Sequence, residues 1–179
     1  MRRACLLMLA ALITTIAGAT TVVPMSVEEL TRASARVVEA QVLDSWSTWN
    51  AEHTRIFTYS RVRVARALKG RSEEVVTVKQ LGGSAGGYTM KVAGVRALSP
   101  GERTLLFLRP SQAGDGTWVI VGLMQGMFHV YAAGGHTMVS NGIHAAVVHE
   151  QRGGAPRREA VRPMTLEEAE SRVRGASTR

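Results

Sequence analysis

The chain has 179 residues, of which 45% are hydrophobic and 20% charged, a composition that supports one packed domain and excludes wholesale disorder. Aromatic residues make up only 5%, so the core must be built mainly from Val, Leu, Ala and Met. The net charge of +8 favours anionic partners. An arginine bias of this kind is explained more simply by a GC-rich genome, and charge alone identifies no ligand.

The first 19 residues have the three parts of a secretory signal peptide. Arg2 and Arg3 give a positive start, residues 5–16 are apolar, and residues 17–19 (Ala-Gly-Ala) form a cleavage site of small residues. The apolar stretch is shorter than the roughly 20 residues that cross a bilayer, and no later segment reaches that length. We therefore expect cleavage after Ala19 and a bacterial, extracytoplasmic location, either periplasmic or secreted. An uncleaved N-terminal anchor is the alternative.

The only cysteine, Cys5, lies in this leader. The mature chain would therefore have no disulfide, no cysteine metal ligand and no cysteine nucleophile. A domain of about 160 residues buries enough apolar surface to fold without such crosslinks.

After the leader, Ser26 and Glu29 have the spacing of a capping box, which predicts a short helix over residues 26–34. Glu28 and Glu29 also suit the positive N-terminal end of a helix. Val27 and Leu30 would give that helix an apolar stripe.

From residue 36 onward, apolar residues recur with a period of two, in short runs separated by Gly- and Pro-rich turns. This pattern predicts a mainly β domain, which we expect to be a small, partly open antiparallel barrel; a β-sandwich is the alternative. Strict alternation in the second run would bury Arg66, so we expect a β-bulge near Ala65. A polar, turn-like segment is expected at residues 46–54. The predicted strands cover residues 36–45, 56–68, 74–81, 88–92, 104–108, 118–123 and 126–132.

The C-terminal part is less regular. One or two weak strands are expected around Met138 and Ala146, and residues 151–163 have the composition of a flexible linker. Thr165 and Glu168 again have capping-box spacing, which predicts a last helix. We divide the chain into a leader (1–19), a β-rich domain (20–150), the linker (151–163) and a short helix with its tail (164–179).

The second predicted strand carries the most distinctive surface. Alternation places Tyr59, Arg61 and Arg63 on one side of the sheet, and Trp46 and Trp49 lie just upstream in the chain. Arginine and aromatic side chains are the usual hot spots of binding surfaces. We therefore assign these five as candidate binding residues; a solvated strand face is the alternative.

Two other patterns have weaker functional meaning. The glycine-rich run at residues 82–87 lacks the Gly-Lys-Ser/Thr ending of a phosphate-binding loop, and a turn that needs backbone freedom explains it better. His136, His144 and His149, with nearby carboxylates, are ligand types that zinc uses, but their spacing matches no zinc motif. We therefore expect no metal or other cofactor.

Three short segments carry a resemblance to a known class. They are residues 36–42 (Arg-Val-Val-Glu-Ala-Gln-Val), Val62-Arg63-Val64 leading to Leu68-Lys69-Gly70, and Pro100-Gly101-Glu102 before the apolar run at 105–108. In this order they resemble the netrin-module and tissue-inhibitor-of-metalloproteinase class, and small exported bacterial proteins look similar. The resemblance implies an oligonucleotide/oligosaccharide-binding-type (OB-type) barrel. In the inhibitors an N-terminal cysteine chelates the zinc of the protease; here Thr20 would be N-terminal and no cysteine remains, so no functional residue carries over.

Together these features predict an exported, non-enzymatic binding module that contacts another protein in the cell envelope or outside the cell. The basic charge adds the expectation of contact with an anionic surface, but we expect no specific nucleic-acid partner and no transmembrane span after the leader. A metal-dependent or other hydrolase with an unrecognised site is the alternative function.

Overall fold

The computed structural model describes residues 24–71, 73–143 and 161–178. The predicted leader, the strand expected around Ala146 and most of the predicted linker lie outside these residues. In the part described, no helix is long and apolar enough to cross a membrane.

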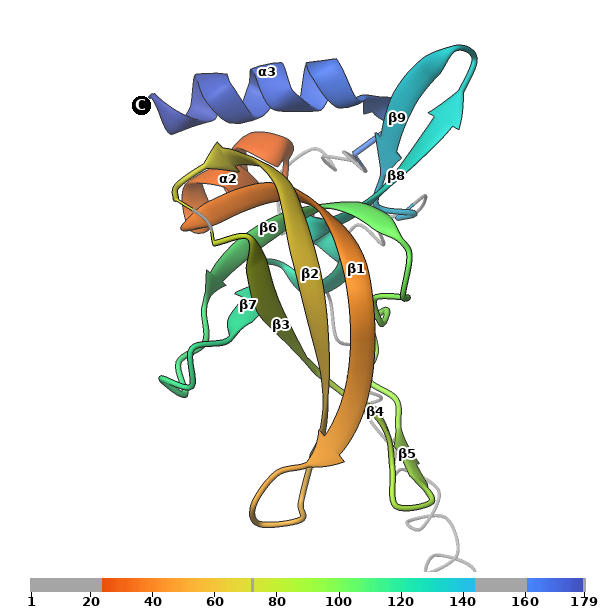
Figure 1. Ribbon diagram of the computed structural model, residues 1–179. Coiled ribbons are helices and arrows are strands. Elements are labelled where there is room, and N and C mark those ends of the chain that lie inside the picture. The colour runs from red at the N-terminus through yellow and green to blue at the C-terminus, as the bar shows by residue number, and fades with distance from the viewer. Residues whose placement is uncertain (1–23, 72, 144–160, 179) are drawn as a thin grey trace, which may run out of the picture.

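Five strands form a ring (Figure 1): β1 (Arg36–Trp49), β2 (Ile56–Lys69), β3 (Val75–Leu81), β7 (Trp118–Ile120) and β6 (Arg103–Pro110). They pair in this order, and β6 pairs back onto β1. All of these pairs are antiparallel except β3 with β7, which run parallel and share the single register pair Val78 and Trp118. The expected mainly β, partly open barrel with two short helices is confirmed, although its sheet is mixed rather than wholly antiparallel.

Three further strands extend the sheet beyond β6: β8 (Met127–Ala133), β9 (His136–Ser140) and β10 (Met164–Thr165). The strand expected around Met138 is therefore present as β9. A separate hairpin consists of β4 (Gly83–Ala85) and β5 (Tyr88–Met90). The glycine-rich run thus builds a hairpin, and the strand predicted at 88–92 ends two residues earlier.

The first predicted strand is longer than expected. β1 continues through Trp49, although residues 46–54 were expected to form a turn. The polar side chains at this end satisfy one another across the strands, because the Ser47 and Thr58 hydroxyls hydrogen-bond at 2.8 Å. A polar sequence can therefore lie in a paired strand without an unsatisfied buried group.

The expected β-bulge in β2 is confirmed. Val64 faces Ala40 and Arg66 faces Glu39, so that Ala65 has no partner in the register. The extra residue shifts the alternation by one place, and Arg66 stays at the surface instead of entering the barrel.

The strand predicted at 118–123 ends early. β7 stops at Ile120, and Gly122 and Leu123 both adopt positive φ angles, +66° and +58°. This left-handed backbone ends the strand and leads into a 3₁₀ helix, η2 (Leu123–Gly126).

Apolar side chains form two cores, one on each face of the curved sheet. The barrel interior holds residues such as Val62, Val78 and Leu106, whereas Phe107 and Phe128 belong to the cluster beneath the helices. β6 contributes to both cores, and its residues 104–108 are all buried. Its continuous apolar sequence therefore reflects burial on both faces.

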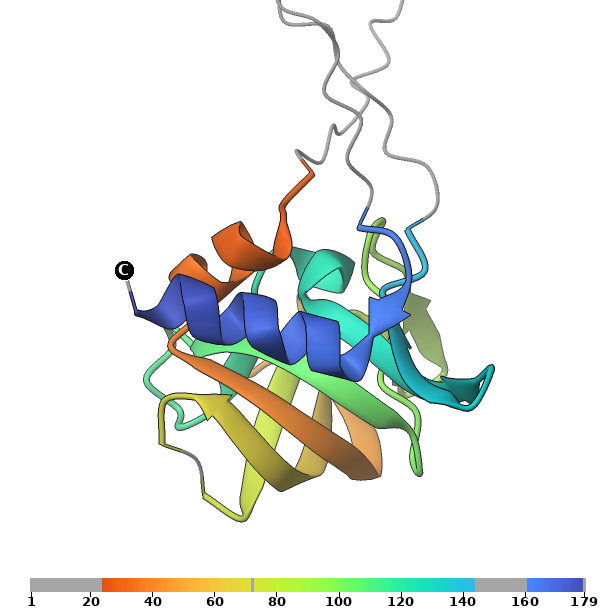
Figure 2. The same cartoon turned by 90° about the horizontal axis from the view of Figure 1, so that it is seen from above.

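Two helices cover the second core (Figure 2): α2 (Val27–Ala33) and α3 (Leu166–Ser177). The predicted capping box of Ser26 and Glu29 is confirmed, with each side chain accepting a hydrogen bond from the backbone N–H of the other. The Thr165 hydroxyl accepts a bond from the backbone N–H of Glu168 and begins α3.

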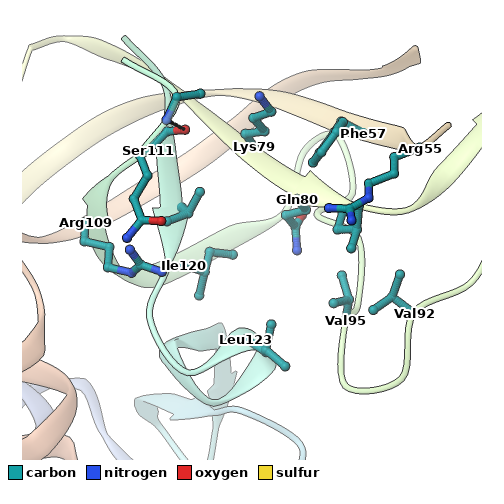
Figure 3. A pocket seen from close by; sticks show the side chains of 14 residues that line it. Arg55, Phe57, Lys79, Gln80, Val92, Val95, Arg109, Ser111, Ile120 and Leu123 are labelled. Carbon is teal, nitrogen blue, oxygen red and sulfur yellow. Dashed lines mark hydrogen bonds between the residues drawn. The ribbon is translucent and has the colours of Figure 1, made fainter. Parts of the chain in front are cut away.

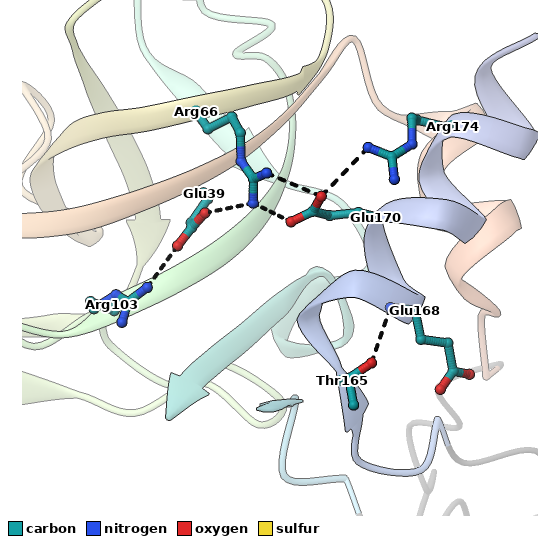
Figure 4. A network of polar contacts seen from close by, with 7 residues as sticks. All are labelled: Glu39, Arg66, Arg103, Thr165, Glu168, Glu170 and Arg174. Atoms are coloured by element: carbon teal, nitrogen blue, oxygen red, sulfur yellow. Dashed lines mark hydrogen bonds and ion pairs between the residues drawn. The ribbon is translucent and has the colours of Figure 1, made fainter. Parts of the chain in front are cut away.

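Charged side chains also attach α3 to the barrel (Figure 4). Arg66 of β2 donates to Glu39 of β1 and to Glu170 of α3, with Nη–Oε2 distances of 3.1 Å to each carboxylate. Arg103 of β6 contacts the other oxygen of Glu39 at 2.9 Å, and Arg174 contacts Glu170 at 3.5 Å. Both carboxylates are buried, at 8% and 6% exposure, whereas the arginine side chains reach the surface and Arg66 is 48% exposed. The network therefore joins three strands and a helix through two buried carboxylates.

The contact between α2 and α3 should weaken in acid. Arg172 donates to both carboxylate oxygens of Glu28, at 2.7 and 2.8 Å, and this bond holds the pKa of Glu28 at about 2, below its ordinary value of 4.5. A carboxyl with a lowered pKa stabilises the fold above pH 4.5, and this contribution is lost as the pH falls through 2. Because both side chains are about one-third exposed, we discount the contribution to about 1 kcal/mol.

We therefore expect Glu28→Gln to lower the Tm by about 3 °C at pH 7, and the difference from the wild type to vanish as the pH approaches 2. Thermal unfolding of both proteins at several pH values measures this convergence. A constant difference between pH 7 and pH 2 would contradict the assignment to this ion pair.

Candidate functional site

The outer face of β1, β2 and β3 brings four of the five candidate residues together. The β1–β2 register pairs Trp46 with Tyr59 and Asp44 with Arg61. On β2, the alternation buries residues 58, 60 and 62 and leaves Tyr59 half-buried and Arg61 and Arg63 exposed. We call Trp46, Tyr59, Arg61 and Arg63 the Trp46 patch.

The aromatic part of the Trp46 patch is a stacked pair. The rings of Trp46 and Tyr59 lie 5.6 Å apart between centroids and 15° from parallel. Trp46 remains 45% exposed in spite of this contact. On the other side of Tyr59, the Lys79 ammonium of β3 lies 5.6 Å from its ring centroid and 4.6 Å from that of Phe57. The patch therefore presents a flat, rigid aromatic surface bordered by cations.

The two arginines of the Trp46 patch differ in their partners. Arg61 is ion-paired with Asp44, and its Nε donates to both carboxylate oxygens at 3.0 and 3.1 Å. This hydrogen bond keeps the pKa of Asp44 below its ordinary value. Arg63 has no ion pair within the residues that the structure describes. The Arg63 guanidinium is thus available for an external carboxylate, whereas that of Arg61 must exchange partners.

Trp49 lies apart from the patch. It pairs with Ile56 in the register, which places it on the opposite face of β1 from Trp46. Its ring meets that of Tyr88 edge-on at 5.6 Å and stacks on His53 at 6.1 Å. The sequence spacing contained this information, because residues three apart on one strand point to opposite faces. The grouping of Trp49 with Trp46 followed from placing both in a turn.

Of the three histidines considered as zinc ligands, only one lies within the residues that the structure describes. His136 is exposed at the start of β9, and His144 and His149 lie outside the described residues. Within the described ranges, no group of three His, Cys, Asp or Glu side chains is placed to hold a metal ion. His129 instead lies 3.4 Å from the buried carboxylate of Glu102.

Close packing against β1 and β2 explains why the run at residues 82–87 needs a glycine. Gly83 has a φ of +122°, and a Cβ at this position would lie 2.3 Å from the Thr58 hydroxyl and 2.4 Å from the Ser47 hydroxyl. The β4–β5 hairpin therefore crosses β1 and β2 at a distance that only glycine permits.

Sequence reasoning missed a cavity where β3 and β7 meet (Figure 3). It has a volume of about 520 Å³ and is lined from β2, β3, β6, β7, η2 and the segments at 92–95 and 111–113. We call it the seam cavity. No local pattern marks it, because its walls come from segments that are far apart in the chain.

No protein-family model matches the chain, and no curated protein matches it. The resemblance to the netrin-module class stays a prediction that rests on short segments.

Proposed function

We propose that the protein is an exported binding module that holds an acidic segment of another protein on the Trp46 patch. The observation that carries the proposal is the stacked, partly exposed Trp46–Tyr59 pair on the same strand face as Arg63, whose guanidinium has no ion pair among the described residues. Aromatic and arginine side chains dominate the energy of protein interfaces. The leader predicted at residues 1–19 supports an extracytoplasmic location.

The chemistry of the patch favours a carboxylate-bearing partner. Arginine binds carboxylates through two parallel hydrogen bonds, and its planar head also stacks on aromatic rings. The Trp46–Tyr59 stack holds both rings before a partner arrives, so that little side-chain entropy is lost on binding. The net charge is +8 for the full chain and +6 without Arg2 and Arg3 of the leader, and it would speed the encounter with an acidic partner at low salt.

We expect partner binding to weaken when either the aromatic pair or the two arginines of the Trp46 patch are disrupted. Trp46→Ala and the double variant Arg61→Ala/Arg63→Ala should each weaken binding by about tenfold or more, as hot-spot substitutions do. Arg71→Ala/Arg162→Ala removes the same charge at exposed positions outside the patch and is the matched control.

The experiment is crosslinking capture from envelope extract, followed by affinity measurement with the captured protein. The protein recovered from the envelope fraction should begin at Thr20. Capture of one acidic protein by the wild type and the control, but not by the patch variants, supports the proposal. Equal capture by all four proteins, with unchanged Tm values, would exclude this face as the binding site.

A further inference from the structure

We propose that the seam cavity is a second binding site, which takes a small amphipathic carboxylate. The ring of strands is weakest at this place, because β3 and β7 share one register pair only. The opening beside that pair is about 520 Å³, within the size range of small-molecule sites. This inference does not rest on the partner proposed for the Trp46 patch.

The floor of the seam cavity is apolar. Its aliphatic and aromatic lining comes from Phe57, Leu81, Val92, Val95, Val119 and Ile120. Figure 3 shows Val92 and Val95 on one side and Ile120 on the other, with the space between them open. Such a lining favours an apolar ligand body, because burial of that body removes both surfaces from water.

The rim of the cavity is cationic. Arg55, Lys79 and Arg109 line it, and none of the lining residues is acidic. Figure 3 places Arg109 at one side and Arg55 at the other, whereas the Lys79 ammonium points upward, away from Gln80 and Leu123. The Lys79 ammonium is paired with the Asp115 carboxylate at 2.8 Å, and Asp115 is not one of the lining residues. Arg55 and Arg109 have no ion pair in the described part of the chain.

The contrast between rim and floor selects the class of ligand. A neutral apolar molecule would fill the floor but leave both guanidinium groups without a partner. A simple inorganic anion would meet the rim but leave the floor exposed. An alkyl or aryl carboxylate fills the floor with its apolar body and meets the rim with its charge, because one arginine pairs with a carboxylate through two parallel hydrogen bonds.

Leu123 provides a second, independent observation. It is one of two non-glycine residues with positive φ in the described chain, and its side chain lines the cavity while remaining 46% exposed. The left-handed conformation is unfavourable for a leucine, because it brings the Cβ too close to the following carbonyl oxygen. The backbone beside it is fixed, because Met124 N–H donates to Gly94 O at 3.1 Å. Strained residues of this kind gather at ligand sites, and an apolar ligand would cover this side chain.

The test is calorimetry on the protein purified from its producing cells. Octanoate and 1-naphthoate are titrated into it in separate experiments. The two probes distinguish an alkyl from an aryl ligand. 1-Octanol and octyltrimethylammonium are the neutral and cationic controls. We expect at least one carboxylate to bind at a ratio of one to one, and both controls to bind at least about tenfold more weakly, as the loss of charged hydrogen bonds predicts. Absence of carboxylate binding, or equal binding of 1-octanol, would overturn the proposal.

Variants connect the binding to this cavity. Arg55→Gln/Arg109→Gln should weaken carboxylate binding by about tenfold, whereas Arg71→Gln, outside the lining, and Arg63→Gln, in the Trp46 patch, should leave it unchanged. Leu123→Asn should raise the Tm, because asparagine tolerates positive φ, and at the same time weaken binding. Wild-type affinity in the double arginine variant would place the carboxylate elsewhere and refute the site. Because Arg63→Gln affects only the protein partner, the two proposals fail separately.

Discussion

Arg66→Met should lower the free energy of unfolding by about 3 kcal/mol at pH 7. The guanidinium is the only group that contacts both Glu39 and Glu170 among the described residues. Its removal leaves two buried carboxylates with weaker compensation, and an uncompensated buried charge is far more costly than the net value of an ion pair. We expect the low end of the usual range, because Arg103 and Arg174 still contact one carboxylate each.

Two further variants separate this explanation from a simple loss of packing. Arg66→Met/Glu170→Gln should recover part of the lost stability, because the glutamine carries no charge that needs a cation. Arg61→Met removes an arginine from the same strand, but its partner Asp44 is exposed, with side-chain exposures of 54% and 41% for the pair. This control should unfold at nearly the wild-type denaturant concentration. Equal losses for Arg61→Met and Arg66→Met in urea denaturation would contradict the role of burial.

The network also explains how a helix at the end of the chain becomes part of the barrel. α3 presents Ala169 and Val173 to the apolar core and Glu170 to Arg66. Apolar burial supplies attraction without direction, whereas the fixed geometry of the guanidinium sets which face of the helix meets β2. The capping residue Thr165 lies in β10, so that α3 begins directly from the sheet.

Local features of the fold were predictable because their causes are local. The capping box needs only the spacing of Ser26 and Glu29, and the bulge at Ala65 follows from the conflict between alternation and a buried arginine. The end of β1 was mispredicted because its stabilisation is not local. Ser47 is acceptable in a strand only when Thr58 lies opposite, and that pairing is not visible in either segment alone.

The two candidate sites also differ in how much of each could be predicted from the local sequence. Alternation along β2 was enough to put Tyr59, Arg61 and Arg63 on one face, whereas the stack with Trp46 required the β1–β2 register. The seam cavity depends on β3 and β7, which are separated by 36 residues in the chain, and on an unusual backbone angle at Leu123. Leucine gives no sequence signal for positive φ, because glycine and asparagine are the residues that normally adopt it.

Gly126→Ala should destabilise the protein by about 3 kcal/mol, in the upper part of the range for overpacked cores. The added Cβ would lie 2.3 Å from the Val121 carbonyl oxygen and 3.2 Å from the Phe107 Cβ. Both neighbours belong to the buried core, so neither atom can move aside without disturbing β6 or β7.

Gly175→Ala is the matched control, because nothing lies within 4 Å of its added Cβ and the residue is inside α3. Alanine there should raise the stability by about 0.5 kcal/mol through helix propensity. Urea denaturation of the three proteins measures both changes, and losses of similar size in the two variants would show that the contact at Gly126 does not limit the packing.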